Sequence, residues 1–314
     1  MINNNLLEGL QNKEKRSIAR LISIIESEND LSYDYLSAIH NKTGNAYRIG
    51  ITGPPGAGKS TITNQLTKAY LSQSRSVAII AVDPTSPYTG GALLGDRVRM
   101  NEIGLDKDVF IRSMASRGNL GGLSNKAVDC ADVLDAAGFD YIIFETVGVG
   151  QSELDIVKVA DTTIVTLVPE SGDSIQAMKA GLMEIADLFV INKFDRPAAE
   201  SAFMSLQTIL HFRLSDRSDW TPPVLKSVAT SNQGIDEIVS EINKHREYLI
   251  DNNIFQKKRV ENLKLRIKDI VSEQISKKIW NTENLKLLHT SMEDVLSGTI
   301  SPYELAKKIS LKFE

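Results

Sequence analysis

The fold class is decided by one stretch of eight residues, Gly53-Pro54-Pro55-Gly56-Ala57-Gly58-Lys59-Ser60. It matches G-x-x-x-x-G-K-[ST], in which glycines let backbone N–H groups curl around a β-phosphate. We expect Lys59 to reach the β- and γ-phosphate oxygens, and the hydroxyl of Ser60 to coordinate Mg²⁺. A β-branched run, Tyr47–Ile51, precedes the stretch, and a helical run from Thr61 to Ser72 follows it. This context predicts a phosphate-binding loop, with Thr61 completing its set of residues, rather than a turn that binds nothing.

The surrounding chain alternates short β-branched runs with longer mixed segments over residues 46–250. The candidate strands are Tyr47–Ile51, Val77–Val82, Val109–Ser113, Tyr141–Phe144, Thr162–Val168, Leu188–Ile191 and Val224–Val228. Several are almost continuously apolar, as expected for parallel strands covered on both faces. The pattern predicts an α/β domain of the P-loop NTPase type with a mainly parallel sheet.

Helical segments are expected on both sides of this domain, at residues 1–45 and 251–314. In the second segment, apolar residues recur at helical spacing among lysines, as in Val260, Leu263 and Ile267. An apolar stripe of this length requires cover. Packing against the chain's own α/β domain and a dimer interface are both open alternatives.

A second motif, Asn192-Lys193-Phe194-Asp195, follows the strand Leu188–Ile191 and fits N-K-x-D. Asp195 can accept hydrogen bonds from N1–H and the 2-amino group of guanine, and adenine has no donor at either position. Asn192 and the stem of Lys193 are expected to hold the plane of the base. Because an unpaired carboxylate discriminates strongly against the wrong ligand, the motif predicts GTP and GDP rather than ATP.

The segment Phe144-Glu145-Thr146-Val147-Gly148 lies between these motifs. In P-loop proteins an acid that ends this strand holds Mg²⁺ through water, and the following glycine N–H meets the γ-phosphate. We therefore expect Glu145 and Gly148 to have these roles. Asp83, at the end of the second strand, and Asp96, in a glycine-rich segment, are further candidates for the metal shell, or else acids of ordinary turns.

The residue that follows Gly148 indicates the rate of intrinsic GTP hydrolysis. Many GTPases place a glutamine there to orient the attacking water. Here the residue is Val149, whose apolar side chain cannot orient water, and the nearest glutamine is Gln151. We expect slow intrinsic hydrolysis that rises when a partner or a moved loop supplies the missing group.

The overall composition limits the disulfides, the partners and the cellular location that are expected of the protein. The chain has 314 residues, a formal net charge of −4 and one cysteine, Cys130, so it can form no internal disulfide. Basic residues are spread rather than clustered, which disfavours nucleic acid and anionic membranes as partners. The first residues lack the apolar core of a signal peptide, and early acids disfavour a transit peptide. We expect a cytoplasmic protein with no membrane span.

Longer strings resemble a specific family: the MeaB/ArgK-type GTPase chaperones of cobalamin-dependent acyl-CoA mutases, whose members attend methylmalonyl-CoA mutase. Relatives have been labelled lysine/arginine/ornithine transport-system ATPases or kinases. The resemblance covers about residues 15 to 250. It is densest at residues 53–61, 83–97 (DPTSPYTGGALLGDR), 117–122 (RGNLGG) and 145–153 (ETVGVGQSE).

This resemblance implies a SIMIBI-type G domain with a Mg²⁺-GTP site. The implied site residues are Lys59, Ser60, Asp83, Asp96 and Glu145. It also implies a homodimer built through the C-terminal helices, and a mutase partner whose cobalamin loading the protein gates and which it protects or rescues during turnover.

Two further positions are read from the same resemblance. Lys179 lies in a segment, about residues 172–187, that is similar to the family's third switch, and it matches a lysine implicated in GTPase activation; a solvated helix lysine is the alternative. In the base loop the family has Ser-Ala or Ser-Gly where this chain has Val228-Ala229. Only backbone contacts from Ala229 are therefore expected. Asn232 occupies a position where glycine is usual.

Three rival functions remain as alternatives. A metal-delivery GTPase shares this type of domain but carries a His-rich tract or paired cysteines, whereas the four histidines here are widely scattered. A kinase for a transport protein would tolerate ATP, which N-K-x-D disfavours. A nucleotide-binding adaptor would show no useful hydrolysis.

Overall fold

The computed structural model describes residues 2–27, 31–84, 101–116, 125–146, 152–171, 180–214 and 220–311. The predicted site residues Asp96, Gly148 and Lys179 lie outside these ranges, as do Val149 and Gln151. For Asp83 only the backbone is described. The chain divides into two compact units, Met1–Phe255 and Gln256–Glu314.

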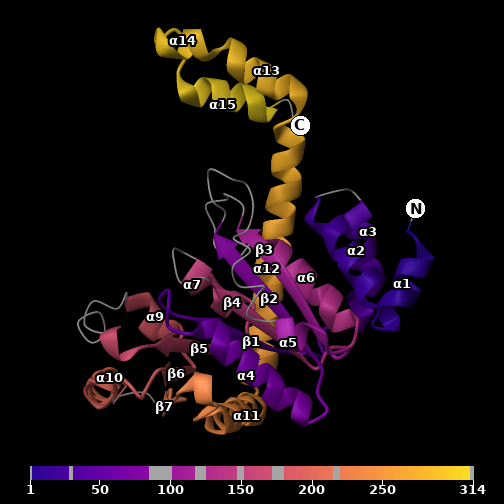
Figure 1. Cartoon of the computed structure of the whole chain (residues 1–314). Helices are drawn as coiled ribbons and strands as arrows, with labels where there is room; N and C mark the ends of the chain where they lie inside the picture. Colours follow the sequence, from indigo (N-terminus) through magenta and orange to yellow (C-terminus); the bar gives the residue numbers. More distant parts are fainter. Residues whose placement is uncertain are drawn as a thin grey trace. The chain divides into compact units, whose positions relative to one another are not determined.

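The first unit is built on a parallel sheet, as predicted. Its strands have the order β3-β2-β4-β1-β5-β6-β7, and every neighbouring pair is parallel (Figure 1). Their bounds are β1 Tyr47–Thr52, β2 Val77–Pro84, β3 Val109–Ser116, β4 Tyr141–Thr146, β5 Thr162–Leu167, β6 Leu188–Ile191 and β7 Val224–Lys226. The seventh strand ends two residues before the expected Val228, which instead forms an isolated bridge with Gln233.

Helices cover both faces of this sheet. One face carries α1 (Asn4–Gln11), α2 (Lys15–Glu26), α3 (Leu31–Ile39), α6 (Asn125–Ala136) and α10 (Ala199–Leu214). The other face carries α4 (Lys59–Ser72), α5 (Asn101–Gly104) and α11 (Ile235–Asp251). Shorter segments are η1 (His40–Lys42), α7 (Ser152–Asp155), η3 (Ile156–Lys158), η4 (Pro169–Ser171), α9 (Ala180–Ile185) and η5 (Ala229–Ser231).

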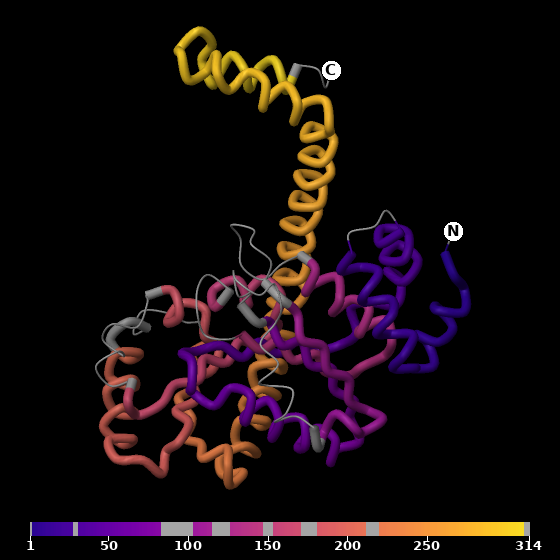
Figure 2. The backbone as a smooth tube through the Cα atoms, turned by 45° about the horizontal axis from the view of Figure 1, so that its top comes forward, coloured from indigo at the N-terminus to yellow at the C-terminus, as the bar shows by residue number. Residues whose placement is uncertain are grey.

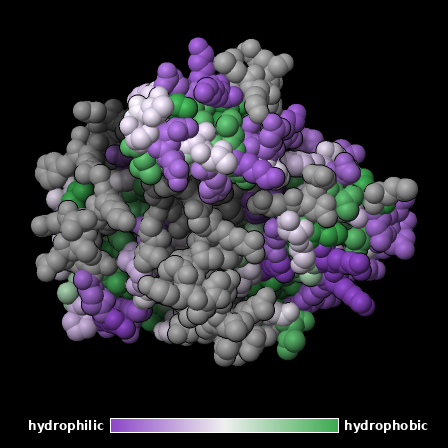
Figure 3. Space-filling view, turned by 90° about the horizontal axis from the view of Figure 1, so that it is seen from above, coloured by the Kyte–Doolittle hydropathy of each residue, from purple (hydrophilic) through white to green (hydrophobic). Residues whose placement is uncertain are grey.

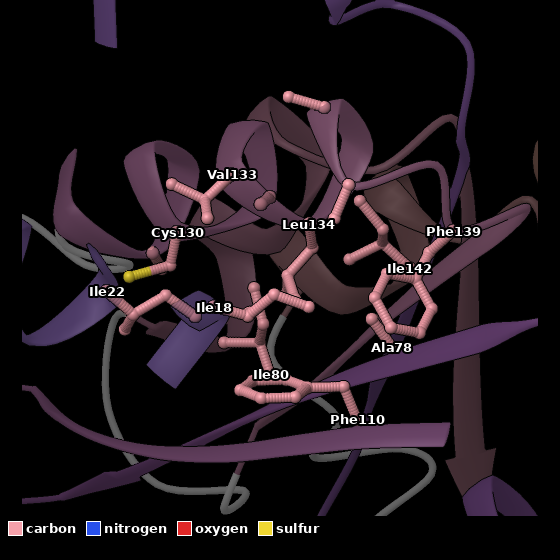
Figure 4. Packing of buried hydrophobic residues seen from close by; sticks show 14 of the residues in the cluster. Ile18, Ile22, Ala78, Ile80, Phe110, Cys130, Val133, Leu134, Phe139 and Ile142 are labelled. Carbon is pink, nitrogen blue, oxygen red and sulfur yellow. The ribbon is translucent and has the colours of Figure 1, made fainter. Parts of the chain in front are cut away.

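Strand residues alternate between the hydrophobic clusters on the two faces of the sheet, because successive side chains of a strand point to opposite faces. In β2, Ala78 and Ile80 belong to the core under α6, whereas Val77 and Ile79 belong to the core under α4 and α11. Figure 4 shows Leu134 of α6 near Ile142, Ala78 and Ile80 of the sheet, and Cys130 of the same helix beside Ile22. This double cover explains why the strands read as continuous apolar runs.

The N-terminal helices share one of these cores. Ile18, Leu21, Ile22 and Ile25 of α2 are fully buried in the same cluster as the strand residues. Their helical spacing places them on one side of α2. The indigo helices accordingly lie beside α6 in both ribbon views (Figure 1, Figure 2).

The second unit is helical. Its elements are α12 (Ile254–Ile279), which starts at the last two residues of the first unit, and α13 (Thr282–Thr290), α14 (Met292–Leu296) and α15 (Pro302–Leu311). The start of α15 is a capping box: Ser301 Oγ accepts from the N–H of Glu304, whose carboxylate accepts from the N–H of Ser301. Within the described parts of the chain, no helix has the length and apolar character needed to cross a bilayer.

Candidate functional site

The glycine-rich loop joins the carboxyl end of β1 to the first residue of α4, as the motif requires. Its conformation depends on glycine: Gly58 has a φ of +88°, in the left-handed region that residues with a Cβ rarely adopt. A Cβ at Gly58 would also lie 2.2 Å from Nδ2 of Asn192. The loop is therefore closed by a residue from the second motif, and only glycine leaves room for it.

Lys59 is the first residue of α4 and is almost completely buried, with 6% of its surface exposed. Its ammonium group donates hydrogen bonds to the carbonyl oxygens of Gly53 at 2.8 Å and Pro54 at 2.9 Å. The side chain therefore folds back over the loop that it follows. A buried ammonium held by neutral carbonyls is well placed to bind an anion, because a phosphate would offer it stronger, charge-assisted hydrogen bonds.

Ser60 and Glu145 are brought into direct contact. The hydroxyl of Ser60 donates a hydrogen bond to Oε1 of Glu145, which is the last residue but one of β4 and is 6% exposed. This contact follows from the sheet, because β4 pairs with β1 and Glu145 lies opposite Ile51 in the register. A hydroxyl and a carboxylate are the hard oxygen ligands that Mg²⁺ prefers, so the two residues fit the predicted metal site. In the neighbouring β2, Asp83 lies near the same end of the sheet.

The N-K-x-D motif reaches the phosphate loop from the carboxyl end of β6. The Asn192 side chain is buried, and its Nδ2 donates to the carbonyl of Ala57 at 2.9 Å. Lys193 has a φ of +58°, and its ammonium donates to the carbonyl of Gly56 at 2.7 Å. Asp195 is exposed, as a carboxylate that reads an incoming base must be. Two motifs about 135 residues apart in sequence are therefore joined by direct hydrogen bonds.

The turn η5 lies beside Asn192. The N–H of Ala229 donates to Oδ1 of Asn192 at 3.1 Å, and its carbonyl accepts from Nε2 of Gln65 at 3.1 Å. Asn232 ends the turn with a φ of +61°, a left-handed conformation that asparagine tolerates better than most residues, so it can stand where a glycine is usual. Gln65 was not predicted from the sequence, because a glutamine on a helix carries no signal of a partner 164 residues away.

All these groups converge on one end of the sheet. The phosphate loop, Asn192 and the η5 turn follow the carboxyl ends of β1, β6 and β7, and Glu145 lies within the last two residues of β4. In open parallel α/β sheets, ligands bind outside the carboxyl ends of the strands. The described part of the site can therefore hold a phosphate chain at Lys59 and Ser60 and a base near Asn192 and Asp195.

A buried polar chain lies near the opposite, amino ends of β1 and β5. The hydroxyls of Tyr47 and Thr162 are 2.5 Å apart, and Oγ1 of Thr162 is 2.8 Å from Nδ1 of His245. Nε2 of His245 lies 3.4 Å from Oδ1 of Asp187. Burial raises the pKa of the Tyr47 phenol far above its ordinary value. His245, one of the scattered histidines considered for metal delivery, thus belongs to a structural network.

Comparison with known proteins shows the family to which the chain belongs. The family described as methylmalonyl Co-A mutase-associated GTPase MeaB matches residues 18–284. A relative from Pyrococcus abyssi is 46% identical over 307 residues, 97% of this chain and 94% of that protein. The GTPase ArgK of Escherichia coli is 34% identical over 309 residues, 96% of this chain and 93% of ArgK.

Two further similarities extend the comparison. The mitochondrial methylmalonic aciduria type A homolog of Mus musculus is 32% identical over 275 residues, 85% of this chain and 66% of that protein. A crystal structure of LAO/AO transport system kinase superimposes with a TM-score of 0.74 at 29% identity, covering 100% of this chain and 99% of the other. The chain thus belongs to the MeaB family of methylmalonyl-CoA mutase-associated GTPases, and it is a P-loop GTPase that binds guanine nucleotides.

Proposed function

We propose that this GTPase acts in the cytoplasm as a regulatory chaperone of a cobalamin-dependent acyl-CoA mutase, methylmalonyl-CoA mutase being the leading candidate. In this role it gates the loading of the cofactor and protects or reactivates the mutase. The observation that carries the proposal is the match of residues 18–284 to a family described as mutase-associated. The similarity to the methylmalonic aciduria type A homolog supports the same reading.

The nucleotide is held at two points in this proposal. At one end, the amides of residues 53–60 and the ammonium of Lys59 bind the β- and γ-phosphates, with Thr61 beside them. At the other end, Asp195 pairs with the guanine edge while Asn192 and Lys193 support the base. The hydrogen bonds from Asn192 to Ala57 and from Lys193 to Gly56 support this arrangement, because they keep the two ends at a constant separation.

Mg²⁺ fits the pair formed by Ser60 and Glu145. When bound there it would neutralise charge on the phosphate oxygens. The Ser60 hydroxyl donates to Glu145 in this structure, so the carboxylate already orients the oxygen that would face a cation. We propose Asp83 and Asp96 as additional members of the metal shell, acting through water.

Hydrolysis is proposed to be slow in the isolated protein. Val149 follows Gly148, whose N–H is the proposed contact to the γ-phosphate, and a valine cannot orient the attacking water. We propose that Lys179 supplies the missing positive charge once the mutase is bound. A charge placed in this way by a partner accelerates GTP hydrolysis by several orders of magnitude in other GTPases.

The C-terminal unit is the proposed dimerisation element. One row of α12 carries apolar side chains that are 42–53% exposed, namely Val260, Leu263, Ile267, Val271 and Ile275. Figure 3 shows hydrophobic side chains among hydrophilic ones on the surface seen from above. Burial of such a row against a second copy would remove it from water. Sedimentation of the full chain tests this, and a monomer at all concentrations would contradict it.

The partner is tested by affinity purification of the full chain from its source cell in the presence of a slowly hydrolysed GTP analogue. We expect a cobalamin-dependent mutase to co-purify, and to be released when GDP replaces the analogue. The Lys59→Ala variant serves as the control that lacks the nucleotide. Recovery of no mutase in either nucleotide state would contradict the proposal, even if the protein hydrolyses GTP.

A second candidate function is a nucleotide-dependent kinase or ATPase linked to transport of basic amino acids. The structural similarity to LAO/AO transport system kinase is the observation that favours it. Competition between ATP and GTP for the purified protein distinguishes the two functions. Equal affinity for the two nucleotides would favour the kinase, whereas strong preference for GTP supports the chaperone.

A further inference from the structure

Gln65 lies on α4, six residues after Lys59, and faces the turn η5. Its Nε2 donates a hydrogen bond to the carbonyl oxygen of Ala229 at 3.1 Å. The N–H of the same residue donates to Oδ1 of Asn192, also at 3.1 Å. Ala229 is only 1% exposed. Both backbone polar groups of Ala229 are therefore held by side chains, one from the phosphate-loop helix and one from the N-K-x-D motif.

The turn requires such support, because its local structure is weak. It follows β7, a three-residue strand at the edge of the sheet whose side chains are only partly buried. The turn itself is a single 3₁₀ segment of three residues, closed by the isolated bridge between Val228 and Gln233. Short 3₁₀ segments have poor hydrogen-bond geometry and gain little stability on their own.

The helix α4, by contrast, is a firm support. Ile62 and Leu66 are completely buried in the core shared with α11 and the sheet. The same helix begins at Lys59, which contacts the phosphate loop. A hydrogen bond from Gln65 therefore fixes the turn relative to the phosphate-binding end of the site through one rigid element.

We propose that Gln65 is a positioning residue for guanine recognition: it holds the carbonyl of Ala229, whose N–H already donates to Asn192, and thereby keeps another backbone donor of the turn in place to face O6 of the base. The inference rests on the proposed guanine site. O6 of guanine accepts a hydrogen bond, whereas the 6-amino group of adenine is a donor and would oppose a backbone N–H. Gln65 thus governs discrimination at purine position 6, whereas Asp195 governs positions 1 and 2.

The test measures the affinities of the full-length protein for GTP, ITP and ATP with Mg²⁺ present. The variants are Gln65→Met, which keeps the shape and removes the donor, and Gln65→Glu, which places an acceptor against the Ala229 carbonyl. ITP keeps O6 and lacks the 2-amino group, so it separates the two reading positions. Gln73→Met is the matched control, because Gln73 is an exposed residue at the end of the same helix.

We expect Gln65→Met to weaken GTP and ITP together by roughly 3- to 10-fold, the loss of one net hydrogen bond. ATP affinity should stay within about twofold, so the GTP:ATP ratio falls while the GTP:ITP ratio does not change. Gln65→Glu should have a larger effect in the same direction, and Gln73→Met none.

Two results would overturn the inference. One is unchanged GTP affinity in both Gln65 variants, and the other is equal weakening of all three nucleotides, which would assign Gln65 to the phosphate end or to general stability. Failure of the wild-type protein to prefer GTP would instead contradict the proposed base site itself. If one variant does not fold, the other decides the outcome.

Discussion

The side-chain amide of Asn192 donates a hydrogen bond to the backbone carbonyl of Ala57 at 2.9 Å, and this contact joins the base-reading motif to the phosphate loop. The other side-chain atom, Oδ1, accepts from the N–H of Ala229. One buried amide thus uses its donor and its acceptor on two different loops. The effects of this arrangement on nucleotide affinity and stability can be tested by single-residue substitutions.

Asn192→Asp keeps the shape and the acceptor but places a carboxylate oxygen against the carbonyl of Ala57. We expect the free energy of unfolding to fall by about 1–3 kcal/mol and the affinity for GTP to fall at least tenfold. Denaturant unfolding and nucleotide titration measure the two effects. Asn252→Asp is the control, since Asn252 makes an exposed bond to the carbonyl of Tyr248; a similar loss in both variants would count against the bridging role.

Lys59→Ala removes the ammonium that the loop carbonyls of Gly53 and Pro54 hold. We expect tight GTP binding to be abolished, because Lys59 supplies the buried positive charge of this loop, whereas Lys193 contacts the loop only at Gly56 through an exposed hydrogen bond. Calorimetry with GTP and Mg²⁺ measures the loss. Lys68→Ala, an exposed position on the same helix, should bind as the wild type does. Unchanged affinity in Lys59→Ala would refute the assignment of the phosphate site.

Asp195→Asn converts the base-reading acceptor into a group that also donates. Guanine then loses its partner for N1–H and the 2-amino group, while xanthine, with an oxygen at position 2, gains one. We expect preference to shift from GTP toward XTP, measured by competition against a labelled guanine nucleotide. Selectivity that does not change would show that another group reads the base.

Thr162→Val replaces the hydroxyl at the centre of the buried chain by a methyl group of similar size. The phenol of Tyr47 and Nδ1 of His245 then lose a shared partner in a fully buried place. We expect a loss of about 2–3 kcal/mol in the free energy of unfolding. Thr208→Val, at an exposed helix position, is the control and should change stability by less than about 0.5 kcal/mol. Equal losses in the free energy of unfolding for the two variants would mean that the buried hydrogen-bond chain makes no specific contribution to stability.

The stability should depend on pH through Asp140. Burial alone would raise the pKa of this carboxyl, but hydrogen bonds from the N–H and hydroxyl of Ser76, with Arg75 beside them, lower the pKa below its ordinary value. A carboxyl whose pKa is lower in the folded state stabilises the protein above the unfolded pKa, about 3.9. That contribution disappears as the pH falls from there through the folded pKa.

We therefore expect the free energy of unfolding of the wild type to fall more steeply than that of Asp140→Asn as the pH is lowered below about 5. Urea unfolding at a series of pH values measures the difference. Parallel curves for the two proteins would contradict the assigned role of the Ser76 hydrogen bonds.

Much of the fold was predictable from the chain. The seven strands lie where the apolar runs indicated, with differences of a few residues at their ends, because residues buried on both faces of a sheet leave a continuous signal. The end of β7 was less predictable. Lys226 is exposed and Val228 pairs only with Gln233, since an edge strand lacks the burial that marks a central one.

The candidate site was predictable in its parts but not in its connections. Residues 53–60 and 192–195 carry their chemistry in consecutive positions, so each motif could be recognised separately. The contact between Ser60 and Glu145 depends on β4 lying beside β1, and the order of strands is not written in any local pattern. Gln65 and His245 were missed as partners of Ala229 and Thr162 for the same reason.

The sequence alone determined the type of ligand and the class of fold. A glycine-rich loop before Lys59 and a carboxylate at Asp195 act through local backbone geometry and functional groups, which neighbouring residues specify. Only the tertiary structure decided which side chains hold the two halves of the site at a constant distance. Such contacts join residues more than 80 positions apart, and their geometry is set by sheet order and core packing rather than by neighbours along the chain.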